Sequence, residues 1–400
     1  MNKNNTNNIY KYWKIRIFYS IFVGYIFFYL TRKNFTFLIP IIINDIKISI
    51  SDIGIISTLF YITYGISKLI CGIISDKTNP RYFMSFGLIF TGIVNICFGF
   101  SSSLLSLSIF WTLNAFFQAW GWPAITKQLT YWFNKNERGF MWGLCSTSHN
   151  ISGAIVPIII LFISSKTGWR NCSFIIGFLT IIIGILLINR LNNTPEKIGL
   201  PPIENEKSNN NKNYIFNEII KNKTIWILSV LYFFVYIIKT AINDWTIIYL
   251  INQKGYELLA AGSGIFFFEL GGFAGILLSG LITDKIFKGN RIKLIIISYI
   301  IIIISSFIFW NIPIGYKKLD YLVITIIGFF IFSPQMLIGL LSTEIVNKNY
   351  VCTANGFVSF FAYFGAATTG YPFGLIINLS WDIYFILIII CNTISIFIMI

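Results

Sequence analysis

The chain has 400 residues, of which 56% are hydrophobic, 18% are aromatic and only 11% are charged. An ordinary soluble domain carries about 25% charged residues, so this composition, with a mean hydropathy of +0.74, excludes one. It predicts an all-α membrane protein with lipid around it. The formal net charge of +15 does not indicate a nucleic-acid partner, because most of the cations fall in the connections between apolar runs.

The N-terminal segment is polar and rich in asparagine up to Lys14, and the apolar run after it has no clear small-residue cleavage site. It therefore lacks the pattern of a cleaved signal peptide. Apolar runs long enough to cross a bilayer as helices, which takes about 20 residues, then follow one another. We expect twelve transmembrane helices, near residues 17–43, 51–74, 82–100, 104–132, 139–163, 169–189, 225–251, 259–282, 292–310, 321–342, 351–377 and 381–400.

A polar connector at roughly residues 191–223 separates the first six spans from the last six. It contains several prolines and the run Asn209-Asn210-Asn211, a composition typical of a linker. We therefore expect two pseudo-symmetric six-helix bundles, with an N-terminal half at 1–190, a cytoplasmic linker at 191–223 and a C-terminal half at 224–400. Because the chain ends at Ile400 inside the last span, no cytoplasmic tail is expected after it.

The two halves carry the same pattern around one cation in a hydrophobic run. Four residues in the first half each have a counterpart 207 residues later; the pairs are Tyr25 and Tyr232, Tyr29 and Tyr236, Arg32 and Lys239, and Thr36 and Asn243. Their spacing puts each quartet on one face of a helix. A charge near the bilayer centre costs at least about 2.5–3.5 kcal/mol. Two cations in equivalent positions therefore predict a shared site for an anion between the halves.

A second repeat, offset by 208 residues, lies in the loops after the second and eighth spans. Residues 72–77 and 280–285 both begin with Gly and end with Asp-Lys, and an arginine follows each. We expect these loops to gate the conformational change through four residues, Asp76, Arg81, Asp284 and Arg291.

The distribution of Lys and Arg predicts the orientation. Of the 30 such residues, 19 lie on the side of the N-terminus, the connector and the two gating loops, 6 lie on the other side and 5 lie within spans. The positive-inside rule therefore places both termini in the cytoplasm.

Ionisable residues inside the spans indicate where the site lies. The cations are Arg32, Lys33, Lys68, Lys127 and Lys239, and the acids are Asp244 and Glu269. This excess predicts a positive interior that suits a multiply charged anion. An ion pair with an acid such as Asp244 is the alternative for Arg32 and Lys239. Lys68 either contacts the anion or snorkels to the cytoplasmic face. Lys33 points about 100° away from Arg32 on the helix, so we expect it to pair with another group or to snorkel.

His149, the only histidine, lies in a polar patch with Ser146, Asn150 and Ser152. Such a residue is usually a hydrogen-bonded core residue. Beside an anion site we expect ligand contact or proton coupling instead, because histidine changes its charge near physiological pH. Aromatic residues either pack the core or donate hydrogen bonds to phosphate and sugar oxygens. The candidates are Tyr25, Tyr29, Tyr64, Tyr236, Trp122 and Tyr363.

No enzymatic chemistry is indicated. The chain has no P-loop, no HExxH and no GxSxG motif. Its six cysteines are scattered through apolar stretches without a CxxC pair. We therefore expect no disulfide framework, no metal site and no other cofactor.

Six short segments and the two gating loops together form a pattern that covers essentially the whole chain. The segments are Tyr29-Leu-Thr-Arg-Lys-Asn-Phe35, Tyr64-Gly-Ile-Ser-Lys68, Trp120-Gly-Trp-Pro123, Ser148-His-Asn150, Asn243-Asp-Trp245 and Ser333-Pro-Gln-Met-Leu-Ile-Gly339. The pattern resembles that of the bacterial organophosphate:phosphate antiporters, a family of the major facilitator superfamily. The resemblance is closest to the hexose-phosphate transporter and sensor branch, and the glycerol-3-phosphate branch is more distant.

The resemblance implies that Arg32 and the residue at position 239 grip a phosphate. It also implies that His149 and Lys68 assist them and that Tyr25, Tyr29, Tyr64, Tyr236, Trp122 and Tyr363 line the cavity. Lys239 departs from the family, which has arginine there. Arginine offers phosphate a planar bidentate fork and lysine only a point charge, so we expect weaker or broader binding. A drift towards AT-rich codons explains the exchange equally well.

The resemblance implies a secondary active transporter of the bacterial inner membrane that works by alternating access. It would exchange a sugar phosphate, such as glucose 6-phosphate, for inorganic phosphate. Two alternatives stay open. One is a membrane sensor of sugar phosphate that acts on a two-component sensor kinase, and the other is a glycerol-3-phosphate:phosphate antiporter.

Overall fold

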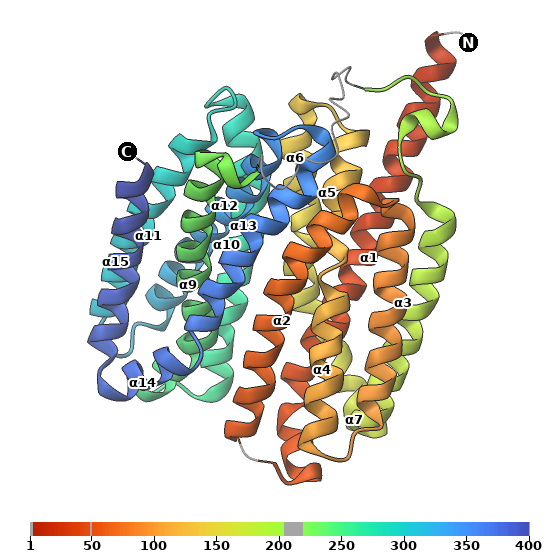
Figure 1. Cartoon of the computed structure of the whole chain (residues 1–400). Helices are drawn as coiled ribbons and strands as arrows, with labels where there is room; N and C mark the ends of the chain where they lie inside the picture. Colours follow the sequence, from red (N-terminus) through yellow and green to blue (C-terminus); the bar gives the residue numbers. More distant parts are fainter. Residues whose placement is uncertain (1–2, 49, 204–218, 400) are drawn as a thin grey trace.

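The protein is a pair of helical bundles standing side by side (Figure 1). The computed structural model describes residues 3–48, 50–203 and 219–399, and within these ranges it contains helices and no strands. Both chain ends lie at the same end of the bundles, which we call the termini end; the other is the opposite end. Part of the predicted linker, including the run Asn209-Asn210-Asn211, lies outside the described residues.

The first bundle is formed by the helices that precede the linker: α1 (Lys3–Ile46), α2 (Ile50–Lys77), α3 (Pro80–Gly99), α4 (Leu104–Gln118), α5 (Gly121–Trp132), α6 (Lys135–Ser146) and α7 (Ser148–Arg190). A 3₁₀ turn, η1 (Pro195–Ile198), follows it. The second bundle is formed by α9 (Lys223–Asn252), α10 (Leu258–Lys285), α11 (Arg291–Asn311), α12 (Lys317–Glu344), η3 (Lys348–Tyr350), α13 (Val351–Thr368), α14 (Tyr371–Leu379) and α15 (Trp381–Met399).

These helices confirm the predicted twelve-span, two-bundle fold, with a difference in three spans. Among the described residues, nine helices are long and apolar enough to cross a membrane. The other three expected spans are each divided between two helices: 104–132 between α4 and α5, 139–163 between α6 and α7, and 351–377 between α13 and α14. Backbone that leaves the helix at membrane depth is tolerated where it is buried in protein or lines a cavity.

Local sequence explains where several helices begin and turn. Asn79 caps α3 by accepting from the backbone N–H of Arg81, and Pro80 occupies the first helical position. Asn134 and Glu137 form a reciprocal capping box at the start of α6. Within α7 the fifth and sixth expected spans meet at Gly168, whose φ of 81° suits glycine.

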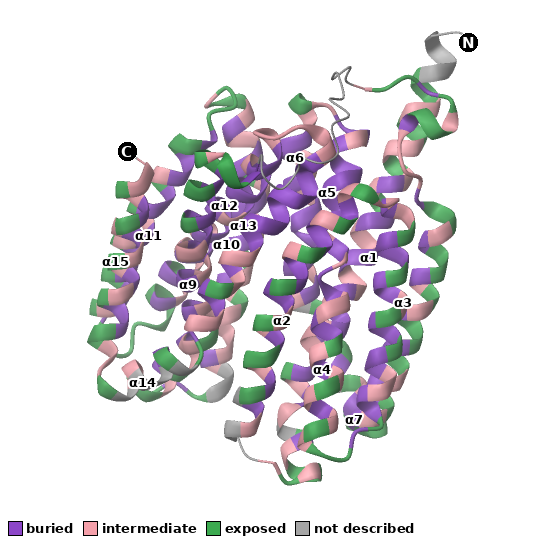
Figure 2. Cartoon of the chain, in the orientation of Figure 1, coloured by how far each residue is buried: buried purple, intermediate pink, exposed green. Residues whose placement is uncertain are grey.

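The outer surface is apolar, as a lipid-facing surface must be. On α2, Ile62, Ile66, Ile70 and Ile74 recur every four residues on one exposed face. Figure 2 shows the same exposed stripes along the flanks of the other outer helices.

The halves meet most closely at the termini end, where α2 crosses α13 and α6 crosses α10. A Cβ added to Gly72 would lie 2.5 Å from the carbonyl oxygen of Cys352, and one added to Gly356 would lie 2.5 Å from that of Lys68. In lipid, helices associate through such close packing of small residues. This end of the interface is therefore closed.

Candidate functional site

A cavity lies between the bundles and consists of two compartments. The outer compartment, of about 170 Å³, lies towards the opposite end, and the inner compartment, of about 50 Å³, lies towards the termini end. Four residues line both compartments: Tyr29, His149, Tyr236 and Tyr363. Because they share walls from both bundles, the compartments can hold two parts of one ligand.

The side chains around the cavity become more exposed towards the opposite end. Lys68 in the inner compartment is only 3% exposed, whereas Thr36 and Asp244 in the outer compartment are exposed. With the glycine contacts closing the termini end, the cavity is open at the opposite end.

Arg32 projects from α1 into the outer compartment, where aromatic rings surround it. Its guanidinium carbon lies 4.0 Å from the ring centroid of Tyr64 and 5.3 Å from that of Tyr29. Its Nε and Nη2 are buried without a hydrogen-bond partner among the described residues. Aromatic faces stabilise a cation without occupying its N–H donors. The fork of Arg32 therefore remains available for an oxyanion.

Lys239 enters the same compartment from α9 in the other bundle. Its Nζ lies 4.5 Å from the ring centroid of Phe332, and within the described residues no carboxylate forms a salt bridge with it at 4.0 Å or less. Asp244 and Glu269 also line this compartment. Asp244 accepts a hydrogen bond from the amide of Asn243 at 2.7 Å. Among the described residues it forms no salt bridge with Arg32 or Lys239, so this predicted alternative is not formed.

Glu269 is held by the other half of the protein. The amide of Asn150 on α7 donates to the Glu269 carboxylate at 2.7 Å. This hydrogen bond joins the two bundles beside Lys239. The Glu269 carboxylate is close enough to that lysine for the two charges to attract each other. Cations in the two compartments still outnumber acids, since Arg32, Lys33, Lys68 and Lys239 face only two carboxylates.

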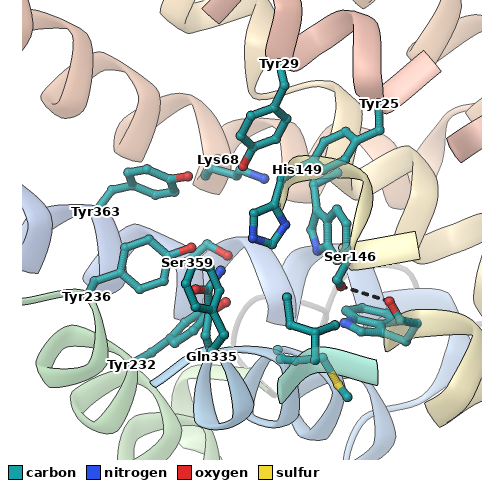
Figure 3. A pocket seen from close by; sticks show the side chains of 16 residues that line it. Tyr25, Tyr29, Lys68, Ser146, His149, Tyr232, Tyr236, Gln335, Ser359 and Tyr363 are labelled. Atoms are coloured by element: carbon teal, nitrogen blue, oxygen red, sulfur yellow. Dashed lines mark hydrogen bonds between the residues drawn. The ribbon is translucent and has the colours of Figure 1, made fainter. Parts of the chain in front are cut away.

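The inner compartment combines a cation, a histidine and several hydroxyl groups (Figure 3). The ring of His149 is sandwiched between Tyr29, at 5.7 Å between centroids, and Phe332, at 5.5 Å. Its Nε2 is buried, and no residue in the described part of the chain forms a hydrogen bond with it. Lys68 also lines this compartment, with its Nζ 5.3 Å from the Tyr64 ring centroid. It lies in the cavity wall and does not snorkel to the surface.

The structure brings nearly all the expected binding residues together. One or both compartments are lined by Arg32, Lys239, His149, Lys68, Tyr25, Tyr29, Tyr236, Trp122 and Tyr363. Tyr64 is the exception. It is 2% exposed and lies behind Arg32. Its ring packs at a tilt against that of Tyr363, at 4.4 Å between centroids, so it supports the wall without lining it.

Lys127 corrects one expectation. The sequence predicts it among the cations of the interior, but Lys127 does not line either compartment. It donates instead to the carbonyls of Ser75 at 2.9 Å, Asp76 at 3.0 Å and Thr78 at 2.6 Å. These carbonyls lie at the end of α2, where a cation is favoured by the helix dipole.

Asp76, beside that cap, reaches across to the other bundle. Its carboxylate accepts the backbone N–H of Cys352 at 3.0 Å, the backbone N–H of Thr353 at 2.7 Å and the hydroxyl of Thr353 at 2.5 Å. These groups belong to the first turn of α13. An acid at a helix N-terminus satisfies orphan donors and interacts favourably with the dipole. Asp76 therefore fastens the two halves together at the termini end.

The other three predicted gating residues bond mainly within their own halves. Arg81 donates to the carbonyl of Ile188. Arg291 pairs with Asp284 at 2.5 Å and with Glu344 at 3.0 Å. Asp284 and Arg291 also approach the other bundle, because a Cβ added to Gly139 on α6 would lie 2.7 Å from Oδ2 of Asp284 and 3.1 Å from Nη2 of Arg291. The repeated residues therefore occupy equivalent sequence positions in the two halves but form different hydrogen bonds and salt bridges.

The family model described as Major Facilitator Superfamily matches residues 21–370. The chain belongs to this superfamily. A solved major facilitator, FucP in the outward conformation, aligns with a TM-score of 0.75 over 96% of this chain and 97% of that chain. The sequences are 14% identical, so this likeness supports the major facilitator fold alone.

Two curated relatives are much more similar. A protein of Chlamydia trachomatis serovar D named probable hexose phosphate transport protein is 42% identical, over 96% of this chain and 90% of that protein. The membrane sensor protein UhpC of Escherichia coli K12 is 40% identical, over 96% of this chain and 91% of that protein.

The cavity of this major facilitator also contains residues that the sequence did not single out as binding residues. They are Ser146, Tyr232, Gln335 and Ser359 in the inner compartment, and Asn243, Asp244 and Glu269 in the outer compartment. Tyr232 and Asn243 could have been included, since both belong to the repeated quartet. Gln335 had a weaker signal: it is an amide within an apolar run, next to a proline inside helix α12.

Proposed function

We propose that this protein is a secondary active transporter that exchanges a hexose phosphate for inorganic phosphate by alternating access. The observation that carries the proposal is the pair Arg32 and Lys239. One comes from each bundle, both line one compartment, and among the described residues neither forms a salt bridge with a carboxylate. The similarity to a probable hexose phosphate transport protein supports the choice of substrate.

A phosphate monoester carries a charge of about −1.5 to −2 at pH 7, which matches two cations. In a cavity with low-dielectric walls this attraction is much stronger than in water. An anion bound between Arg32 and Lys239 therefore draws the halves together. His149 and Lys68 assist at the junction of the compartments, and the aromatic wall formed by Tyr25, Tyr29, Tyr64, Tyr236, Trp122 and Tyr363 contacts the rest of the ligand.

In this proposal residues 1–190 and 224–400 rock against each other, and 191–223 links them. Both termini lie in the cytoplasm of a bacterium, as the distribution of Lys and Arg supports. The cavity therefore opens to the outer side of the inner membrane. Asp76 holds the cytoplasmic side closed. Exchange follows because the unloaded, positive cavity rearranges slowly, whereas the anion-loaded cavity rearranges quickly.

Reconstitution tests the proposal. Proteoliposomes loaded with inorganic phosphate are expected to take up labelled glucose 6-phosphate saturably, and each uptake event is accompanied by exit of phosphate. Arg32→Ala is expected to abolish uptake, because it removes charge-assisted bonds that contribute about 1.5–3 kcal/mol each. Uptake by the variant at the wild-type rate would refute the role of the paired cations.

A sensor is the second candidate, and the 40% identity to the membrane sensor protein UhpC supports it. The same reconstitution separates the two. A receptor would bind glucose 6-phosphate with a measurable dissociation constant but would not release phosphate from loaded liposomes. Binding without exchange would therefore replace the transporter proposal with a receptor that signals to a membrane kinase.

A further inference from the structure

One wall of the inner compartment is polar but uncharged. It is formed by α12 and α13, which contribute Gln335 and Ser359. Gln335 follows Pro334 within α12, and Figure 3 shows it on the cavity wall together with Ser359 and Tyr232. This wall faces the ligand from the second bundle.

The amide of Gln335 makes no hydrogen bond to any described residue, and its Oε1 is buried. Leaving a buried acceptor unpaired costs about 1–3 kcal/mol. Neutral polar side chains elsewhere in these helices are bonded; Asn355, for example, donates to the carbonyl of Gly339 at 3.1 Å. An unpaired amide that lines a cavity is thus free to pair with a ligand.

The chemistry of the amide indicates which part of a ligand it recognises. A carbonyl oxygen requires a donor, and the amide NH₂ requires an acceptor. A sugar hydroxyl supplies both, whereas an ionised phosphate oxygen supplies only acceptors. The Oε1 of Gln335 therefore repels a phosphate oxygen and attracts a hydroxyl hydrogen.

The positions of the charged groups give the ligand a direction. Arg32 and Lys239 lie in the outer compartment and Gln335 lies in the inner compartment. A phosphoryl group held between these two cations leaves the rest of the ligand to extend into the inner compartment, which Lys68 also lines.

We propose that Gln335 is a specificity residue that hydrogen-bonds hydroxyl groups of the transported molecule and so selects sugar phosphates over inorganic phosphate. This inference rests on the proposed exchange function and extends it.

The test compares wild type with Gln335→Met, which keeps the size of the side chain but has no amide. Affinities are measured for inorganic phosphate, glycerol 3-phosphate, glucose 6-phosphate and its four singly deoxygenated analogues at carbons 1 to 4. One or two neutral hydrogen bonds contribute about 1 kcal/mol each, so the variant is expected to bind glucose 6-phosphate roughly 5- to 30-fold more weakly. The exposed Gln253→Met at the end of α9 is the matched control and should behave as wild type.

Two results identify a specificity role rather than a structural one. First, the rate of phosphate-for-phosphate exchange by Gln335→Met stays within about twofold of the wild-type rate. Second, wild type binds at least one deoxy analogue more weakly than glucose 6-phosphate, and the variant binds the two compounds equally well. If phosphate exchange falls in parallel with glucose 6-phosphate binding, or if the variant keeps wild-type discrimination among the analogues, the inference is wrong.

The proposed function can fail separately from this inference. If wild type binds glucose 6-phosphate but exchanges no phosphate, the exchange proposal fails, and calorimetric binding of the same compounds still decides the role of Gln335. A wild-type protein that binds all the deoxy analogues as tightly as glucose 6-phosphate overturns the inference whether or not it exchanges phosphate.

Discussion

Removing the charge of Asp76 is expected to loosen the closed termini end. The carboxylate accepts three hydrogen bonds from the first turn of α13, and hydrogen bonds to charged groups contribute about 1.5–3 kcal/mol each. Asn in its place keeps one acceptor oxygen and loses the interaction with the helix dipole. We therefore expect Asp76→Asn to destabilise the closed gate by about 2–4 kcal/mol.

Hydrogen–deuterium exchange measures this change directly, because two of the three donors are the backbone amides of Cys352 and Thr353. Since about 1.4 kcal/mol corresponds to a factor of ten, exchange in the first turn of α13 should become roughly 30-fold to several hundred-fold faster. The control is Asp45→Asn. It removes a carboxylate that bonds within the first bundle at the opposite end and should leave exchange in α13 unchanged.

Two outcomes would refute the reasoning. If the Asp76→Asn protein is folded and its α13 amides exchange at the wild-type rate, the carboxylate does not hold the gate. If exchange rises equally throughout both bundles, Asp76 stabilises the whole fold rather than the closed gate, and the reasoning is equally wrong.

Three further predictions concern other charged groups. Lys239→Arg restores a bidentate fork and should tighten phosphate binding about tenfold by titration calorimetry; an unchanged dissociation constant would contradict a direct contact. Lys127→Met removes the cap of α2 and should lower the maximal exchange rate while the Michaelis constant stays within about twofold; a change confined to the Michaelis constant would place the side chain in the cavity after all. Hydrogen bonds from Trp169 and Arg170 hold the pKa of Asp45 below its usual value, so its stabilising contribution is present above the unfolded pKa and is lost as the pH falls through the folded pKa. The melting temperature of Asp45→Asn should consequently fall less between about pH 5 and pH 3 than that of wild type, and parallel curves would disprove it.

The spans and the two bundles could be predicted because lipid imposes a simple rule on the backbone. Every peptide group in the hydrocarbon must bond within its own helix, so long apolar runs identify the helices. The breaks between α4 and α5, α6 and α7, and α13 and α14 were not predictable in this way. They depend on neighbouring helices that shield the freed peptide groups, and a hydropathy pattern contains no information about neighbours.

The cationic part of the site was predictable for a related reason. A charge such as Arg32 is costly within a span and therefore conspicuous. Lys127 was equally conspicuous but bonds to the end of α2, since sequence cannot say which loop lies beside a given side chain. Gln335 was overlooked because one neutral amide in an apolar run costs much less than a charge.

The glycine contacts at the termini end have a consequence for how easily the protein changes state. Where Gly72 and Gly356 meet, peptide groups touch directly, so the surfaces can part without any large side chain leaving a pocket. A contact between peptide groups adds little to the apolar area that such a separation uncovers. Each glycine also sets how closely the backbones of α2 and α13 approach each other. A single added methyl group would hold the bundles apart, so one substitution is enough to change the proportion of molecules open to either side of the membrane.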